Sequence, residues 1–181
     1  MKKEMIESVR NYLSNFGLID KRILDAMDKI DRRGFVPDDF KDKAYLDNAI
    51  PILKTQTISQ PSTVARMISL LKLKKGDSVL EIGTGSGWNA SLISYIVKPG
   101  KVLSLEIYKE LINNSKNNIK NLNLKNLEIK NEDFREIKEK FDKIIFSAGI
   151  SKEDIIVDFV RSNLKENGIL VCPYRSGPLI I

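Results

Sequence analysis

Apolar side chains recur every three or four positions along the start of the chain. The first series begins at Met5 and stops at Gly17, which predicts an amphipathic helix. A second series predicts another helix, with Asp20 as its N-cap. Its apolar positions are Ile23, Leu24, Met27 and Ile30. Residues 32–52 contain glycine and prolines without a sustained period, and they are predicted to form an ordered loop with short turns.

From Pro61 onward, short apolar runs alternate with segments of helical period. The predicted strands are SVLEIG, KVLSLEI, NLEIK, FDKIIFSA and ILVCPY. Helices are predicted after Pro61, over WNASLISYIV, over Lys109–Leu122, and around Ile156 and Phe159. Nearly continuous apolar strands separated by helices are typical of a parallel sheet covered on both faces. The sequence therefore predicts an α/β fold with a doubly wound, mostly parallel sheet.

The stretch from Thr55 to Thr63 is rich in small hydroxyl and amide side chains. Ser and Thr before an apolar series are common N-caps, and Pro61 suits a first helical turn. We therefore expect residues 60–63 to begin a helix and to cap it. That interpretation does not account for the earlier part, residues 56–59.

The chain of 181 residues is long enough for one domain with a sizeable core, and no linker divides it. We expect one structural unit in which residues 1–60 form N-terminal helices and a substrate-side loop, and residues 61–181 form a ligand-binding domain. No apolar run approaches membrane length, and MKKEMIESVR has the pattern of an amphipathic helix rather than of a signal peptide. These features predict a cytoplasmic protein.

The composition restricts the chemistry. The chain has no histidine, which removes the usual general base near neutral pH and the commonest zinc ligand, so we expect no metal site. The single cysteine, Cys172, lies in an apolar run and is predicted to be a buried, inert thiol. The net charge of +6 comes from lysines and arginines spread among acidic residues, which favours a solvated surface over a nucleic-acid site.

The first predicted strand ends in LEIGTGSGWNA, where Gly83, Gly85 and Gly87 are spaced G-x-G-x-G. Glycines there allow a tight strand-to-helix turn and a close approach of the backbone to a ligand. The spacing differs from the G-x-G-x-x-G of dinucleotide-binding enzymes and from the phosphate-binding P-loop.

Acidic residues follow the next two strands. Glu106 ends VLSLEI, where a carboxylate can accept both hydroxyls of a ribose. Asp133, in NEDF, is a candidate acceptor for the exocyclic amine of an adenine. The alternative interpretations are a surface glutamate and an ordinary turn aspartate. Together with the glycines, the two acids indicate a site for an adenosine-containing ligand.

These motifs resemble the S-adenosylmethionine site of Rossmann-like methyltransferases. DRRGFVP, KAYLDNAIPI and QTISQPSTVARMISLL, followed by VLEIGTGSGWNA, further resemble the protein-L-isoaspartate O-methyltransferases, in the same order and with similar spacing. The resemblance implies methylation of the free α-carboxyl group of L-isoaspartyl residues in damaged proteins. It also implies S-adenosyl-L-methionine as the cofactor, S-adenosyl-L-homocysteine as the product, isoaspartyl peptides as partners, and no metal. The oligomeric state is left open.

The resemblance implies a role for each matching residue. Ser59 corresponds to the active-site serine, whose hydroxyl hydrogen-bonds the substrate carboxylate. The strip beside it that meets cofactor and substrate is Gln56, Thr57 and Ile58. Val36 and Pro37 correspond to residues of the peptide-binding cleft. The implied cofactor contacts are Glu81, Gly83, Gly85, Ser86, Glu106, Ile107, Asp133 and Phe134.

Three features depart from the family pattern. Leu53 and Thr55 occupy places that are usually glycine, so their side chains obstruct a peptide there or the loop has ordinary φ values. Phe134 replaces the glycine that follows the adenine-contacting acid and is expected to pack on the adenosine. The chain ends at SGPLII, where the family continues, so we expect a shortened C-terminal end.

The implied chemistry suits a chain without histidine. A carboxylate has a reference pKa of about 4, so it is ionised at neutral pH and needs no base before it attacks a methyl group. Isoaspartyl methyl transfer is thus the first hypothesis. The alternatives are a methyltransferase of the same ancestry that acts on a small carboxylate or RNA, and a cofactor-binding protein without catalysis.

Overall fold

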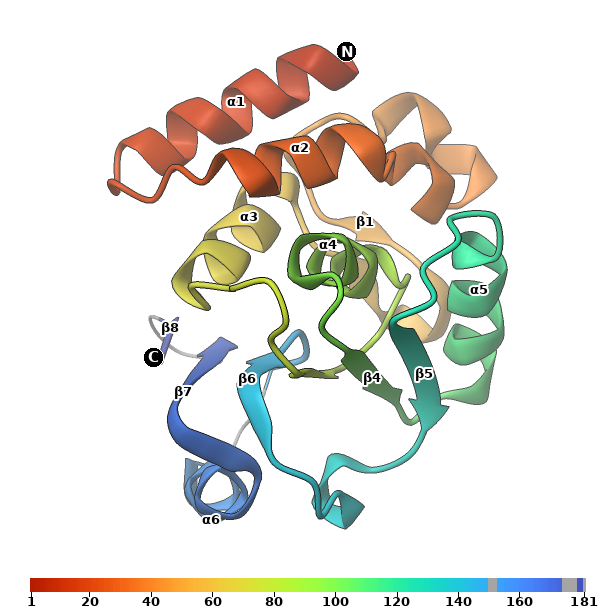
Figure 1. Cartoon of the computed structure of the whole chain (residues 1–181). Helices are drawn as coiled ribbons and strands as arrows, with labels where there is room; N and C mark the ends of the chain where they lie inside the picture. Colours follow the sequence, from red (N-terminus) through yellow and green to blue (C-terminus); the bar gives the residue numbers. More distant parts are fainter. Residues whose placement is uncertain (150–152, 174–178, 181) are drawn as a thin grey trace.

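The computed structural model describes residues 1–149, 153–173 and 179–180 of the chain. Two N-terminal helices, α1 (Lys2–Ser14) and α2 (Lys21–Lys29), lie on one side of a central sheet (Figure 1). The predicted cap of α2 is confirmed, because the Asp20 side chain accepts a hydrogen bond from the backbone N–H of Arg22 at 2.9 Å. In the described part of the chain, no helix has the length and apolarity needed to cross a membrane.

The sheet is mostly parallel, with the strand order β5-β4-β3-β6-β7-β8. Its strands are β3 (Val79–Ile82), β4 (Val102–Glu106), β5 (Leu127–Asn131), β6 (Phe141–Phe146), β7 (Leu164–Pro173) and β8 (Leu179–Ile180). The first five run parallel, and β8 is antiparallel to β7. The predicted mostly parallel sheet is confirmed, and the carboxyl ends of its parallel strands meet at one edge.

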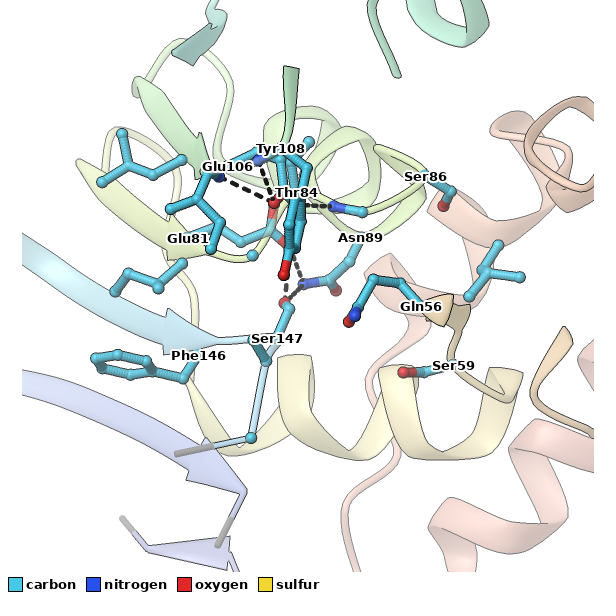
Figure 2. A pocket seen from close by; sticks show the side chains of 18 of the residues that line it. Gln56, Ser59, Glu81, Thr84, Ser86, Asn89, Glu106, Tyr108, Phe146 and Ser147 are labelled. Carbon is cyan, nitrogen blue, oxygen red and sulfur yellow. Dashed lines mark hydrogen bonds between the residues drawn. The ribbon is translucent and has the colours of Figure 1, made fainter. Parts of the chain in front are cut away.

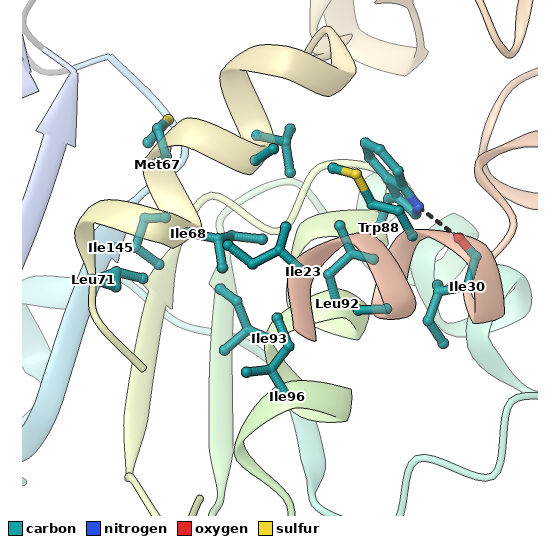
Figure 3. Packing of buried hydrophobic residues seen from close by; sticks show 14 of the residues in the cluster. Ile23, Ile30, Met67, Ile68, Leu71, Trp88, Leu92, Ile93, Ile96 and Ile145 are labelled. Carbon is teal, nitrogen blue, oxygen red and sulfur yellow. Dashed lines mark hydrogen bonds between the residues drawn. The ribbon is translucent and has the colours of Figure 1, made fainter. Parts of the chain in front are cut away.

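Successive side chains along each strand point to opposite faces of the sheet, so the core forms two layers. On one face Val79, Val102 and Ile145 belong to a cluster with buried residues of helices α1 to α4. Figure 3 shows this cluster extending from Ile145 and Leu71 at one end to the fully buried Trp88 at the other. On the other face, Leu80 and Ile144 belong to a second cluster that includes residues of α6 (Glu153–Asn163). Cys172 is buried in this second cluster, where burial raises the pKa of its thiol to about 11, as expected for an inert thiol.

The helix α4 (Trp88–Val97) has the bounds predicted from WNASLISYIV, whereas two other boundaries differ. α5 (Lys109–Ile119) stops before Leu122, because the chain enters a turn with Asn123 at φ +50°. β7 begins at Leu164 rather than at Ile169, because pairing with β6 extends the strand through a polar stretch. Tyr174, at the end of the last predicted strand, and residues 175–178 and 181 lie outside the described residues.

The loop between α2 and the next helix, α3, is ordered and contains short turns, as predicted. Its elements are η1 (Arg32–Phe35), η2 (Asp38–Lys43), β1 (Ile50–Pro51), η3 (Leu53–Thr55) and β2 (Thr57–Ile58). β1 and β2 pair antiparallel around η3, a hairpin that the sequence pattern did not predict. This hairpin leads directly into helix α3 (Pro61–Leu70).

The first turn of α3 is capped by a residue that lies far from it in the sequence. The predicted cap was wrong, because Gln60 is the N-cap residue but its side chain forms no capping hydrogen bond. Its amide donates instead to the Ser62 hydroxyl at 3.0 Å. The backbone N–H of Ser62 donates to the carboxylate of Asp47 at 2.8 Å, which supplies the acceptor that the helix start needs.

Candidate active site

A cavity of about 410 Å³ opens at the carboxyl ends of β3, β4 and β6. Its walls combine the glycine loop with segments that follow three strands and with residues 56–59 of the hairpin. Figure 2 shows Gln56 and Ser59 extending from one wall toward the side of the cavity that holds Asn89 and Ser147. Ligands of parallel α/β sheets bind at this edge, so the cavity lies where the fold predicts a site.

The glycine loop uses backbone conformations that suit glycine. Gly83, Gly85 and Gly87 have φ values of +95°, +52° and +86°. A Cβ on Gly83 would lie 3.0 Å from the Cβ of Ala148 and 3.1 Å from its backbone nitrogen, so a larger residue does not fit. The loop therefore requires glycine at this position both for its φ value and for its contact with the segment after β6.

The carboxylate of Glu106 is held by backbone donors at the end of β4. One oxygen accepts from the N–H of Gly85 at 3.0 Å, and the other accepts from Ile107 at 2.9 Å and from Tyr108 at 3.2 Å. Only 7% of Glu106 is exposed, and it lines the cavity. This acid is thus fixed against the glycine loop with its charge stabilised by three N–H groups.

Glu81 is a second acid of the site and is fully buried. Its carboxylate accepts hydrogen bonds from Asn89 at 2.6 Å, from Ser147 at 2.8 Å and from Ser104 at 2.6 Å. Burial raises its pKa to about 7 despite these donors, and the nearby charge of Glu106 adds to the rise. Glu81 therefore changes its protonation state near neutral pH.

Asp133 and Phe134 line the cavity after β5. The Asp133 carboxylate accepts from the Nε and Nη2 of Arg135 at 2.9 Å and 2.6 Å, and these hydrogen bonds lower its pKa. The Phe134 ring makes edge contacts with Phe146 and Phe159, with centroids 5.4 Å and 5.0 Å apart. Phe134 thus joins the wall of the cavity to the second core cluster.

The hairpin that leads to Gln56–Ser59 contacts helix α5 and the glycine loop. Lys54 in η3 forms an ion pair with Glu110 in the first turn of α5, with 2.7 Å between Nζ and Oε1. The Cδ1 of Ile52 lies 3.7 Å from the Cβ position of Gly85. Residues 52–59 therefore pass close to the glycine loop.

Thr55 has a left-handed backbone conformation with φ +56°, directly after Lys54 at φ +58°. The expectation that ordinary φ values explain the missing glycine was wrong for this residue. Its β-branched side chain is unfavourable at positive φ. Leu53 is 48% exposed and does not line the cavity.

The structure brings most of the predicted site residues together. Those that line the cavity are Gln56, Thr57, Ile58, Ser59, Glu81, Gly83, Gly85, Ser86, Glu106, Ile107, Asp133 and Phe134. Val36 and Pro37 are not part of this lining: Val36 is buried in the first core cluster and Pro37 is exposed before η2.

Sequence reasoning missed several residues of the site. Tyr108 and Ser147 line the cavity directly after β4 and β6, a position that the rule about carboxyl ends of strands could have identified. Asn89 and Ser104 carried no such signal, because they reach Glu81 from α4 and from within β4. In the ranges that the structure describes, no group of three or more acidic or cysteine side chains is placed to hold a metal ion.

Comparison with known proteins identifies similar chains. A family model described as protein-L-isoaspartate(D-aspartate) O-methyltransferase matches residues 1–178. A protein-L-isoaspartate O-methyltransferase from Fervidobacterium nodosum is 40% identical over 169 residues, which cover 90% of this chain and 81% of the relative.

Solved structures show the same similarity. A protein-L-isoaspartate O-methyltransferase structure has a TM-score of 0.82 at 26% identity and covers 96% of this chain, which spans 55% of that longer chain. A protein-L-isoaspartate O-methyltransferase from Plasmodium falciparum, in complex with S-adenosyl-L-homocysteine, has a TM-score of 0.76 at 27% identity. It covers 97% of this chain and 84% of its own. Both comparisons extend over the N-terminal helices as well as the sheet.

Replacing Glu81 by glutamine should change how stability depends on pH. The folded-state pKa of Glu81 is raised, so folding favours its protonated form, and this contribution to stability is lost as the pH rises from about 4.5 to about 7. Because glutamine does not titrate, the free energy of unfolding of E81Q relative to wild type should increase by about 2 to 3 kcal/mol between pH 5 and pH 8. Urea denaturation at the two pH values measures this difference. An exposed control, E139Q, should show no comparable trend, and a pH-independent difference for E81Q would contradict the assignment.

Replacing Thr55 by glycine should stabilise the protein. Relief of the positive φ of a β-branched residue is expected to outweigh the greater freedom of glycine in the unfolded chain, so the free energy of unfolding should rise by about 0.5 to 1 kcal/mol. The control is Thr57→Gly in the extended strand β2, which should lower stability because glycine gains more freedom in the unfolded chain. Thermal unfolding measures the melting temperatures of both variants relative to wild type. A lower melting temperature for T55G would count against strain at this residue.

Proposed function

We propose that this chain, which belongs to the protein-L-isoaspartate O-methyltransferase family, transfers a methyl group from S-adenosylmethionine to the free α-carboxylate of L-isoaspartyl residues. The family membership and the fold are those of an S-adenosylmethionine-dependent methyltransferase that takes part in protein repair. The observation that carries the proposal is that one cavity joins the glycine loop and Glu106 to the strip Gln56–Ser59.

The cofactor half of the cavity suits S-adenosylmethionine. In the proposed complex, Gly83, Gly85 and Ser86 lie beside the methionine portion. Glu106 accepts hydrogen bonds from the ribose hydroxyls. The three N–H donors to Glu106 support this role, because they hold the carboxylate in place before a ligand arrives. Two buried acids also favour a ligand that carries a positive sulfonium and an ammonium group.

The adenine is assigned to the end of β5. Asp133 would accept its exocyclic amine, while Ile107 and Phe134 pack on the adenosine. The edge contacts of Phe134 with two other phenylalanine rings support this arrangement, because they restrain its ring at the wall of the cavity. Glu81 would orient the amino group of the methionine portion. After methyl transfer, S-adenosyl-L-homocysteine would be the product.

The other half of the cavity is proposed to receive the methyl acceptor. A hydroxyl on Ser59 can donate to a carboxylate oxygen, and Gln56, Thr57 and Ile58 line the space between Ser59 and the glycine loop. S-adenosylmethionine, when bound, would supply a methyl group on a positively charged sulfur: the carboxylate oxygen would form the new bond to the methyl carbon, and the electron pair of the broken carbon–sulfur bond would remain on sulfur. The products are a neutral methyl ester and a neutral thioether.

This reaction needs alignment more than it needs acid–base chemistry. The carboxylate is ionised at neutral pH, so no base has to remove a proton before the attack. The protein's part is to hold the oxygen, the methyl carbon and the sulfur in line and to exclude water. A chain without histidine can supply all of these functions.

The N-terminal region is proposed to form the peptide side of the site. In this arrangement residues 1–60 pack on the ligand-binding residues 61–181, and Val36 and Pro37 belong to the cleft that receives an isoaspartyl peptide. The buried contact of Val36 with the first core cluster supports a role in shaping that cleft rather than in touching the cofactor. Isoaspartyl proteins are the proposed partners, and a cytoplasmic location remains a prediction from the sequence.

Methyl transfer from radiolabelled S-adenosylmethionine tests the proposal. An isoaspartyl peptide should acquire base-labile label, whereas the same peptide with a normal aspartyl residue should not, because its free carboxylate is placed differently. Transfer to RNA or to a small carboxylate alone would favour the alternative methyltransferase, and cofactor binding without any transfer would favour a non-catalytic protein.

The Ser59→Ala variant tests the role of the serine. Loss of its hydrogen bond to a charged carboxylate is expected to lower kcat/KM by roughly 10-fold to 100-fold. Binding of S-adenosyl-L-homocysteine, followed by calorimetry, should change little. Full activity of S59A would remove Ser59 from the mechanism.

A further inference from the structure

Arg32, the first residue of η1, is fully buried, and its guanidinium donates hydrogen bonds to backbone carbonyls. Nη1 donates to the carbonyl oxygens of Ala44 at 2.7 Å and of Leu46 at 3.3 Å. Nη2 donates to Asn48 at 2.9 Å and to Ser59 at 3.1 Å. One side chain thus joins the segment before the hairpin to the backbone of Ser59.

The position of Arg32 is itself constrained. Its guanidinium carbon lies 5.5 Å from the centroid of the buried Trp88 ring, and the Trp88 indole donates to the carbonyl of Ile30 at 3.0 Å. Burial lowers the pKa of Arg32 to about 10, so the group stays charged at neutral pH. No ion pair with Arg32 is found in the described residues, so its charge is stabilised by these carbonyls, the aromatic ring and the field of Asp47.

A second contact holds the chain on the other side of Ser59. The Asp47 carboxylate accepts from the backbone N–H of Ser62 at 2.8 Å, at the first turn of α3. Asp47 itself lies between Leu46 and Asn48, whose carbonyls bind Arg32. The four residues 59–62 are therefore fixed at both ends by one short segment of the loop.

The Ser59 side chain has no comparable restraint. Within the parts of the chain that are described, no hydrogen bond is made by its hydroxyl, although Ser59 lines the cavity. The location of the hydroxyl is then set by the backbone at residue 59 and by a single side-chain torsion. Any shift of this backbone moves the hydroxyl relative to the glycine loop.

We propose that Arg32 and Asp47 are positioning residues that act through Ser59, by holding its backbone where the hydroxyl meets the acceptor carboxylate. This inference rests on the proposed function of Ser59. Neither residue lines the cavity, so neither touches the cofactor or the reacting atoms. Their effect is on the alignment of the carboxylate with the methyl group, which controls the rate of an in-line transfer.

A double-mutant cycle on Asp47 and Ser59 tests the inference. Asp47 is exposed on the surface, so its truncation to alanine is compatible with folding. In the wild-type background D47A should lower kcat/KM for the isoaspartyl peptide on the order of 10-fold. In the S59A background the same change should lower it by less than about 2-fold, because the hydroxyl that it positions is gone.

Three further variants supply a conservative replacement, a matched control and a test of Arg32. D47N keeps an oxygen acceptor for the N–H of Ser62 and should restore most of the lost activity. The matched control D42A removes an exposed aspartate of η2 and should leave kcat/KM unchanged. Arg32→Lys, which cannot reach four carbonyls with one ammonium, should lose activity in the wild-type background at least as strongly as D47A.

The outcomes separate the two proposals. Equal losses from D47A in both backgrounds, in an enzyme that methylates the isoaspartyl peptide, would overturn the positioning role and leave the proposed function intact. Wild-type kcat/KM in Arg32→Lys would remove the arginine from the inference. A wild-type protein that transfers no methyl group to the isoaspartyl peptide would overturn the proposed function, and with it the inference.

Discussion

Two buried carboxylates, Glu81 near the end of β3 and Glu106 at the end of β4, constrain the segments that line the cavity. A buried acid is unfavourable unless hydrogen-bond donors surround it, and each of the two obtains its donors differently. Glu106 uses backbone N–H groups, one of which comes from Gly85 and connects this acid to the glycine loop. Glu81 uses side chains from α4, from β4 and from the segment after β6. The same hydrogen bonds therefore stabilise the acids and connect four separate segments of the chain around one cavity.

The local parts of this arrangement were visible in the sequence. Apolar alternation predicted the strands, and an apolar series located α4 at its observed bounds of Trp88–Val97. The glycine spacing and Glu106 identified residues that line the cavity, because these features lie next to one another along the chain or at the ends of consecutive strands. Prediction succeeded where short-range periodicity and strand direction determine the structure.

The remaining features depend on contacts between distant residues. The cap of α3 comes from Asp47 rather than from the hydroxyls beside it, and nothing in the local pattern distinguishes these donors and acceptors. An arginine in a charged loop is usually exposed, yet Arg32 is buried because several carbonyls converge on it. The left-handed backbone at Thr55 is likewise imposed by the hairpin rather than by the preference of threonine. Contacts between residues far apart in the sequence therefore determine the cap of α3, the burial of Arg32 and the backbone conformation of Thr55.

The ion pair between Lys54 and Glu110 makes one end of the hairpin sensitive to salt. Both side chains are about half exposed, and an exposed pair of this kind contributes little to stability and is screened by salt. The hairpin is thus anchored firmly at its base, where Arg32 binds the backbone, and only loosely at its tip, where it meets α5. The two ends of the hairpin therefore differ in how strongly they depend on the solvent, because one is held by buried hydrogen bonds and the other by exposed charges. Added salt weakens the contact at the tip, whereas the buried hydrogen bonds to the backbone of Ser59 are screened much less.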